Sequence, residues 1–201
     1  MTTTGKLPSW AKALSILLAL GVWQLAAWLV QSHLLLVSPW TALVRLATLS
    51  GQGAFWLAVS HSLGRILLGF ALALVTGIVL AVVSARWHLV DTLLWPYMAA
   101  IKATPVASFI ILCLIWLDSR SLSVFISFLM VLPIIYTSVL QGIRATDIQL
   151  LEMAAVFKVS RWRRLVYIYR PQLRPFLVAS CTVATGLAWK AGIAAEVIGI
   201  P

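Results

Sequence analysis

Residues 151–171 read LEMAAVFKVSRWRRLVYIYRP, a basic segment in a chain that is otherwise strongly apolar. Glu152 is its single acidic residue. Its Lys and Arg residues are Lys158, Arg161, Arg163, Arg164 and Arg170. Whether this charge serves a nucleic acid, a membrane surface or a partner protein depends on the chain around it.

The composition is that of a membrane protein. Of the 201 residues, 62% are hydrophobic and 10% are charged, and the mean hydropathy is +1.03, whereas roughly a quarter of the residues of a soluble domain are charged. The 10 Trp residues fit this class, because indole rings favour the headgroup region. The net charge of +10 lies between hydrophobic stretches and does not cover a soluble domain, which argues against nucleic acid as a partner.

Five hydrophobic stretches are long enough to cross a bilayer, which takes about 20 residues of helix. They are residues 13–30, 66–84, 89–117, 122–140 and 173–195. The first is longer than the core of a signal peptide and has no clean cleavage site, so we expect it to remain as a transmembrane helix. The expected fold is all-α, a polytopic bundle of about five transmembrane helices that forms one domain over residues 1–201.

Two local patterns refine this bundle. Residues 66–84 carry small side chains at every fourth position, at Gly69, Ala73, Gly77 and Ala81; such a stripe lets another helix approach closely, the alternative being a merely Ala-rich helix. Residues 89–117 are longer than one crossing requires, and we expect a kink or break at Thr104-Pro105, because proline removes a backbone hydrogen bond. Residues 40–49, WTALVRLATL, form a short amphipathic stretch suited to the membrane interface.

The Lys and Arg residues outside the spans are divided unevenly between the two sides. With the N-terminus in the cytoplasm, the outer side holds Arg45, Arg65 and Arg120. The inner side then holds Lys6, Lys12, Arg86, Arg144, Arg174 and the five basic residues of the segment. The positive-inside rule therefore predicts a cytoplasmic N-terminus, and it places the basic segment in an inward-facing loop at residues 142–172.

The loop has the pattern of two short helices. Asp147 is placed to cap the first and Ser160 to begin the second, and Pro171 and Pro175 mark the entry to the last span. One apolar side of the first helix comprises Leu150, Leu151, Ala154, Ala155 and Phe157, and the second helix carries Trp162, Leu165, Val166 and Tyr169. Together with a projecting Glu152, this pattern indicates a plug for a partner's groove.

The spacing of these residues resembles the EAA signature of binding-protein-dependent ABC transporter permeases. Glu152-Met153-Ala154, then Lys158, then Ile168-Tyr169-Arg170-Pro171 correspond to that family's Glu-Ala-Ala, Gly and Ile-x-Leu-Pro. The stretches HSLGRILLGF (61–70), IKATPVASF (101–109) and GLAWKAGIAAEVIG (186–199) resemble the nitrate/sulfonate/taurine branch, and the resemblance extends from about residue 40 onward.

The chain departs from the family pattern in three places. Arg170 stands where the family has Leu, and Lys158 stands where it usually has Gly. Glycine permits a left-handed turn that Lys adopts only at a cost of about 1 kcal/mol, which leaves the turn free to take another shape here. Members of the branch usually continue past residue 199 into a further transmembrane helix, so we expect that a final span is missing, through truncation or loss.

The resemblance implies a permease subunit of an ATP-driven importer. ATP hydrolysis would belong to a separate ATPase subunit, and this chain has no GxxxxGK[ST] loop of its own. The residues that the resemblance assigns to ATPase coupling are Glu152, Ala154, Ala155, Phe157, Lys158 and Pro171. Further expected partners are a second permease copy, as a homodimer, an extracytoplasmic solute-binding protein, and membrane lipid beside Trp162. The solute would be an anion such as nitrate or a sulfonate, or a cofactor precursor.

Lys102 and Lys190 lie within spans, where a charge costs about 2.5–3.5 kcal/mol on insertion scales. One explanation is a translocation pathway for an anion that includes Lys102, Lys190 and Glu196. The other is that each Lys snorkels or pairs with a carboxylate such as Glu196. Lys190 and Glu196 are poor partners within one helix, because six residues correspond to about 120° around its axis.

Two other classes of protein stay open. A non-transporting scaffold would bind anionic lipid through its basic loop, at about 1 kcal/mol per Lys or Arg. A secondary transporter would show inverted repeats, and none is evident. Cys113 and Cys181 lie in apolar segments without metal-ligand spacing, so we expect no catalytic site, metal or cofactor.

Overall fold

The computed structural model describes residues 9–30 and 36–199, without the side chains of Ser9, Ser119 and Arg120. Regular structure in these ranges is helical throughout, which confirms the expected all-α class. The packing divides the chain between Val59 and Ser60 into two units, which are described separately. Lys6, part of the predicted charge asymmetry, lies outside the described residues.

The first unit contains α1 (Ser9–Val30), α2 (Pro39–Ser50) and the first residues of α3 (Gly53–Arg86). The amphipathic stretch is α2, as the pattern of residues 40–49 suggested. It starts at Pro39 because the Ser38 hydroxyl accepts a hydrogen bond from the Thr41 N–H at 3.2 Å. The Trp23 indole N–H donates to the Val37 carbonyl at 3.1 Å, which connects α1 to the start of α2.

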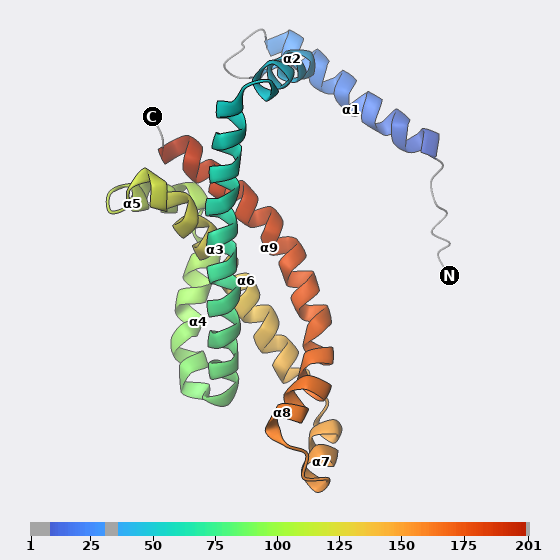
Figure 1. Ribbon diagram of the computed structural model, residues 1–201, viewed down its shortest axis with the longest axis vertical. Coiled ribbons are helices and arrows are strands. Elements are labelled where there is room, and N and C mark those ends of the chain that lie inside the picture. The colour runs from blue at the N-terminus through green and yellow to red at the C-terminus, as the bar shows by residue number, and fades with distance from the viewer. Residues whose placement is uncertain (1–8, 31–35, 200–201) are drawn as a thin grey trace. The chain divides into compact units, whose positions relative to one another are not determined.

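The second unit contains the rest of α3 and all later helices (Figure 1). These are α4 (His88–Ala103), α5 (Val106–Leu114), α6 (Ser119–Arg144), α7 (Ile148–Val156), α8 (Arg161–Arg164), the π-helix η1 (Leu165–Tyr169) and α9 (Arg170–Gly199). In the described ranges, four helical segments are long and apolar enough to cross a membrane, and the α4–α5 pair makes a fifth if it is counted as one span. This agrees with the expected number.

The predicted break at Thr104-Pro105 is confirmed. The axes of α4 and α5 differ by 100°. Thr104 has an extended backbone (φ −84°, ψ 131°), the conformation that a following proline favours. The third hydrophobic stretch therefore turns sharply within its length and does not cross as one straight helix.

The small-residue stripe of α3 lies against α6, which confirms the expected close packing. Gly69, Ala73, Gly77 and Ala81 are all buried. A Cβ atom on Gly69 would lie 2.4 Å from the carbonyl oxygen of Val124, a distance that no side chain tolerates. The α3 and α6 backbones touch here because the residue has no side chain.

A second stripe, on α9, was not anticipated. Its buried residues are Ser180, Ala184, Ala188, Ala191, Gly192, Ala195 and Gly199. The Ser127 hydroxyl of α6 donates to the Ala188 carbonyl at 3.3 Å, and the Ser123 hydroxyl donates to the Gly192 carbonyl at 3.2 Å. Such bonds between transmembrane helices contribute about 0.6 kcal/mol each on average, so the small residues and the two serines together fix α9 on α6.

The last span begins earlier than predicted, because the second of the two expected short helices is not separate from it. The chain is helical without interruption from Arg161 to Gly199. It passes Pro171 through the wide turn of η1, in which the Arg170 N–H bonds the Leu165 carbonyl five residues earlier. Because proline has no N–H and its ring clashes with the carbonyl four residues back, the wider turn allows the helix to continue.

Candidate functional site

The predicted loop forms one end of the second unit, where α7 and α8 follow α6 and lead into α9 (Figure 1). Both predicted helix starts are present. Asp147 Oδ1 accepts from the Gln149 N–H at 2.9 Å and caps α7, and the Ser160 hydroxyl accepts from the Arg163 N–H at 3.5 Å at the start of α8.

The faces of α7 differ from the prediction. The expected apolar side is divided, because Ala154 is buried and Leu151 half-buried, whereas Ala155 and Phe157 are exposed. Phe157 is 74% exposed and Val156 is 78% exposed. Glu152 is exposed on the same helix. The helix thus offers an apolar surface with one carboxylate, and Ala154 alone anchors it fully to the unit.

The turn after α7 keeps the shape that a glycine would give. Lys158 has a φ of 50°, the left-handed region, and is the one non-glycine residue with positive φ among those described. The Val159 N–H donates to the Ala154 carbonyl at 2.9 Å, and the Lys158 N–H donates to the Ala155 carbonyl at 3.1 Å. These two bonds form a Schellman motif, so Lys158 takes the conformation expected of the family's glycine, at its own cost of about 1 kcal/mol.

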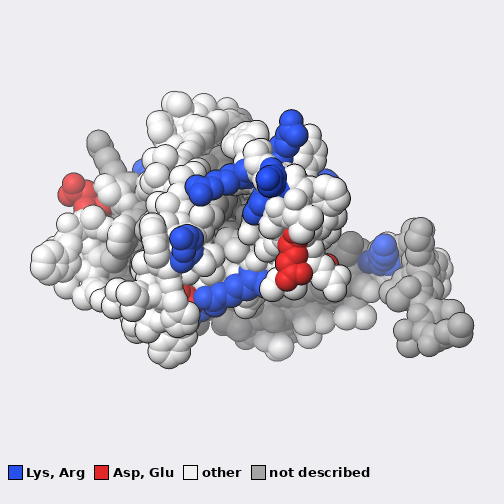
Figure 2. Space-filling view, turned by 90° about the horizontal axis from the view of Figure 1, so that it is seen from below, with Lys and Arg blue, Asp and Glu red and all other residues white. Residues whose placement is uncertain are grey.

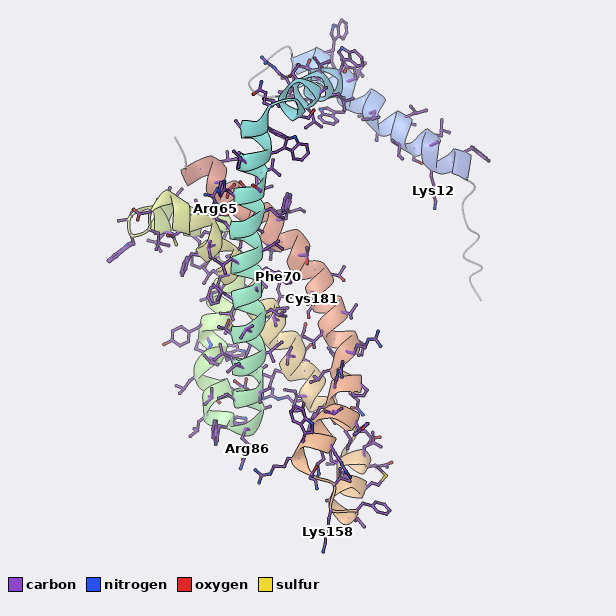
Figure 3. The ribbon with its side chains drawn as sticks, viewed as in Figure 1. Lys12, Arg65, Phe70, Arg86, Lys158 and Cys181 are labelled. Carbon is purple, nitrogen blue, oxygen red and sulfur yellow. The ribbon has the colours of Figure 1, made fainter. Side chains whose placement is uncertain are left out.

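Basic side chains gather at this end of the unit. Figure 2 looks onto it from below and shows Lys and Arg side chains far outnumbering Asp and Glu. Figure 3 shows Arg86 and Lys158 toward this end and Arg65 toward the other. The exposed basic residues of the loop and its flanks are Arg86, Arg144, Lys158, Arg161, Arg163, Arg170 and Arg174. Pro171, the second residue of α9, is exposed among them.

Lys102 lies in a groove of about 280 Å³ between α4 and α6. Its Nζ donates to the Thr137 hydroxyl at 3.4 Å, and that hydroxyl donates in turn to the Pro133 carbonyl at 2.7 Å. The groove also exposes Trp95 and Gln141. Within the described part of the chain, the Lys102 ammonium has no carboxylate partner, so one wall of the groove carries an uncompensated positive charge.

A polar network closes the other end of this groove, and the sequence did not reveal it. Arg144 Nη2 lies 2.6 Å from Asp91 Oδ2, and the Tyr136 hydroxyl donates to Asp91 Oδ1 at 2.9 Å. The Ser84 hydroxyl lies 3.1 Å from that of Tyr136. The network joins the ends of α3, α4 and α6 immediately before the loop. An acidic residue early in α4 and a basic residue late in α6 were its only signal, and a single sequence does not pair them.

The other charged residues of the predicted pathway lie elsewhere. Glu196 Oε1 accepts from Arg65 Nε at 3.0 Å and from Arg65 Nη2 at 2.9 Å, which connects α9 to α3. Lys190 is exposed on α9 and makes no hydrogen bond or ion pair with described residues. Neither Lys190 nor Glu196 lines the groove of Lys102, so the structure does not bring the three charges together.

Residues 73–201 match the family described as "Binding-protein-dependent transport system inner membrane component". The chain is 26% identical over 148 residues to the nitrate import permease protein NrtB of Leptolyngbya laminosa, an alignment that covers 73% of this chain and 53% of that protein.

Two relatives in Escherichia coli align over more of the chain. A putative aliphatic sulfonates transport permease protein, SsuC, is 30% identical over 183 residues, which is 88% of this chain and 68% of that protein. The taurine transport system permease protein TauC is 25% identical over 182 residues, 88% of this chain and 66% of that protein. The chain spans about half the length of the first relatives it matches.

The family match covers well over half of the chain, and it includes the loop, the groove and the two small-residue stripes except for Gly69. The helical architecture, with its candidate membrane spans, agrees with it. The chain therefore belongs to the inner membrane components of binding-protein-dependent transport systems, and it is a multi-pass inner-membrane protein.

Proposed function

We propose that this chain is the permease subunit of an ATP-driven importer and that α7 is the surface on which the ATPase subunit docks. The observation that carries the proposal is the outward apolar surface of α7, where Val156 and Phe157 stand exposed beside Glu152. A contiguous exposed apolar patch that includes an aromatic side chain and adjoins charged residues is typical of a surface that a partner buries. ATP hydrolysis takes place in the partner, because family members of this kind are not catalytic.

Each residue of the docking surface has a distinct role in this proposal. Phe157 fills an apolar pocket of the ATPase, and Glu152 makes a charge-assisted hydrogen bond beside it. Ala155 is small enough to allow close approach. Ala154, Lys158 and Pro171 act on shape, since they hold α7, its turn and the start of α9 in place.

The basic end of the unit faces the cytoplasm in this proposal, and the N-terminus lies on the same side. The uneven distribution of Lys and Arg supports this orientation. The permease works with a second permease copy, which we take to be identical, and with an extracytoplasmic binding protein that delivers the solute. Trp162 and its basic neighbours rest at the membrane surface.

The solute that best fits is a small anion. The relatives are named for nitrate, bicarbonate, aliphatic sulfonates and taurine. The groove between α4 and α6 supplies an ammonium, that of Lys102, with no ion-pair partner among the described residues, and the carboxylate that lines the groove, Asp91, is paired with Arg144. A lysine in a span costs about 2.5–3.5 kcal/mol on insertion scales, and attraction of an anion gives the chain a reason to keep it.

The docking surface is tested by Glu152→Lys in the full-length permease, with Asp118→Lys as the matched control. Asp118 is an exposed carboxylate at the far end of α6 and makes no capping bond, so its replacement changes the net charge equally. We expect the ATPase subunit to co-purify with the wild type and with Asp118→Lys and to be lost from Glu152→Lys. Equal retention by both variants would refute docking through Glu152.

The same variant separates docking from lipid binding. A scaffold that holds anionic lipid through its basic loop gains from a further positive charge. Two results together would favour the scaffold. The Glu152→Lys variant would bind phosphatidylserine vesicles as well as the wild type or better, and even the wild type would retain no ATPase. The anion assignment is checked by Lys102→Gln, for which we expect transport of the anion to fall about tenfold while the ATPase stays bound.

A further inference from the structure

We infer that Arg164 is the positioning residue that connects the docking helix α7 to the last membrane span. Its guanidinium holds the turn after α7 against the start of the long helix that ends at Gly199, so a displacement of α7 moves α9. The inference rests on the proposed docking of an ATPase on α7 and adds the residue through which that docking acts on the membrane part.

The contacts of Arg164 set it apart from its neighbours. Its Nη2 donates to the Ala154 carbonyl at 3.1 Å, and its Nε donates to the Val159 carbonyl at 3.0 Å. The side chain is half-buried. Within the described part of the chain, Arg161, Arg163 and Arg170 are exposed and their side chains make no hydrogen bond or ion pair. One of the four arginines in the segment therefore faces the protein, and the others face outward.

The two carbonyls that Arg164 binds belong to the turn: that of Ala154 is an acceptor of the Schellman motif, and that of Val159 directly follows Lys158. A helix leaves its last carbonyls without partners inside the helix. The Ala154 carbonyl accepts the Val159 N–H of the Schellman motif and the guanidinium together, which fills both of its lone pairs. A planar guanidinium spans two carbonyls with fixed geometry, which the single ammonium of a lysine does not reproduce.

The two hydrogen bonds of the Arg164 guanidinium, called the brace below, compensate for a strained backbone at Lys158. Lys158 holds a left-handed conformation that costs an L-residue with a side chain about 1 kcal/mol, and such a conformation persists only where the surroundings enforce it. Arg164 binds carbonyls on both sides of Lys158. Arg164, which lies outside the turn, therefore stabilises the left-handed conformation of Lys158, the position where the family usually has glycine.

The brace also reaches the membrane part of the protein. Arg164 lies in the helical path that runs from Arg161 through η1 to Gly199. That path is fixed on α6 by the Ser127 to Ala188 hydrogen bond and by the buried small residues of α9. Arg164 thus joins the end of α7 to a continuous helix that packs against the centre of the unit, while the Asp147 N–H, which donates to Gln172 Oε1 at 3.2 Å, joins the start of α7 to α9.

The first test needs no ATPase. Amide hydrogen exchange of Lys158 and Val159 is measured on the full-length permease in nanodiscs, because both N–H groups donate within the turn. We expect Arg164→Lys to speed their exchange about tenfold and Arg163→Lys to leave it unchanged, since Arg163 carries the same charge without the contacts. The double variant Arg164→Lys/Lys158→Gly should recover slow exchange, because glycine needs no brace at positive φ.

The second test measures coupling in proteoliposomes that hold the complete transporter. We expect Arg164→Lys to keep the ATPase bound within about threefold of wild type, because Glu152 and Phe157 remain in place. The solute moved per ATP hydrolysed should fall about tenfold. It should stay low in the double variant with Lys158→Gly, in which the turn is restored but its connection to α9 is not.

The outcomes separate the inference from the function it rests on. A coupling ratio in Arg164→Lys equal to that of wild type, with the ATPase still bound, overturns the inference alone. Full recovery of the ratio in the double variant also overturns it, because Arg164 would then act only on the shape of the turn. A wild type that retains no ATPase refutes the proposed function, and this inference falls with it.

Discussion

Replacing Gly69 by alanine tests how closely α3 and α6 are packed. A Cβ at this position would lie 2.4 Å from the Val124 carbonyl oxygen, 2.9 Å from Ser127 Cβ and 3.2 Å from the Phe128 nitrogen. Carbon and carbonyl oxygen normally approach no closer than about 3.3 Å, so the two helices must separate by about 1 Å. Two of the three obstructing atoms belong to the α6 backbone and have no rotamer by which to move away.

The matched control is Gly64→Ala, on the same helix. A Cβ on Gly64 meets no atom within 4 Å. Both variants gain about 1 kcal/mol in helix propensity, and only Gly69→Ala loses the roughly 1–3 kcal/mol of an overpacked core. The difference in stability between the two variants is therefore about 2 kcal/mol. At about 2–4 °C per kcal/mol for a chain of this size, the melting temperatures should differ by about 4–8 °C.

The assay follows the reaction of Cys113 with a maleimide dye as the full-length protein is heated, in a Cys181→Ala background that removes the other described thiol. Cys113 is buried, so its thiol reacts when the unit opens. We expect Gly64→Ala to melt at or slightly above the wild-type temperature and Gly69→Ala clearly below Gly64→Ala. Identical melting temperatures for the two variants would refute the close contact between α3 and α6.

Three further perturbations follow from the described contacts. Asp91→Asn should lower the free energy of unfolding by about 1 kcal/mol, because the Arg144 side chain of this pair is half exposed and screened by solvent; urea denaturation in detergent checks this, and Asp91→Asn in an Arg144→Ala background should cost little more. Arg65→Ala and Glu196→Gln should each lower the free energy of unfolding, and a double-mutant cycle should give a coupling free energy of about 1 kcal/mol between them. Thermal unfolding of the two single variants and the double variant checks this, and additive effects would argue against the ion pair. Phe157→Ala should leave the stability of the isolated permease within about 0.5 kcal/mol, since the ring is exposed, but weaken ATPase binding in a titration by about 2 kcal/mol or more; an unchanged affinity would remove Phe157 from the docking surface.

The parts of this protein that follow from local chemistry were predictable. The spans follow from runs of apolar residues, and the break before α5 follows from the missing N–H of Pro105. The contact of α3 follows from the spacing of its small residues. The starts of α7 and α8 follow from side chains that cap them, Asp147 and Ser160. Each of these features is determined within a few residues of the chain.

The parts that depend on how helices meet were not predictable in the same way. The stripe on α9 begins with the four-residue spacing of the one on α3 and then departs from it, since Ala191 and Ala195 are also buried. Ser180 and the neighbouring Trp189 and Lys190 make it hard to recognise in the sequence. Arg164 is indistinguishable by sequence from Arg163, because which of them turns inward depends on the helical phase set beyond the loop.

The continuity of the last helix past Pro171 was missed for a related reason. Proline near a span entrance usually marks a helix start. Here the helix had begun ten residues earlier and changed its turn to pass the ring. A single sequence gives the position of the proline but not the hydrogen-bond pattern around it.

The wide turn of η1 has a geometric consequence for the two ends of that helix. Five residues in a π-helix rotate less about the helix axis than five residues in an α-helix do. The difference in rotation is roughly a quarter of a turn. This angle sets how the Arg164 side of the helix is aligned with its Ala188 side. If these five residues formed an ordinary α-helix and the small residues of α9 still faced α6, Arg164 would be rotated by roughly a quarter of a turn. Its side chain would then point away from the Ala154 carbonyl. The π-turn thus rotates one end of the helix relative to the other, so that a single helix makes both the Arg164 contact with the loop and the Ala188 contact with α6.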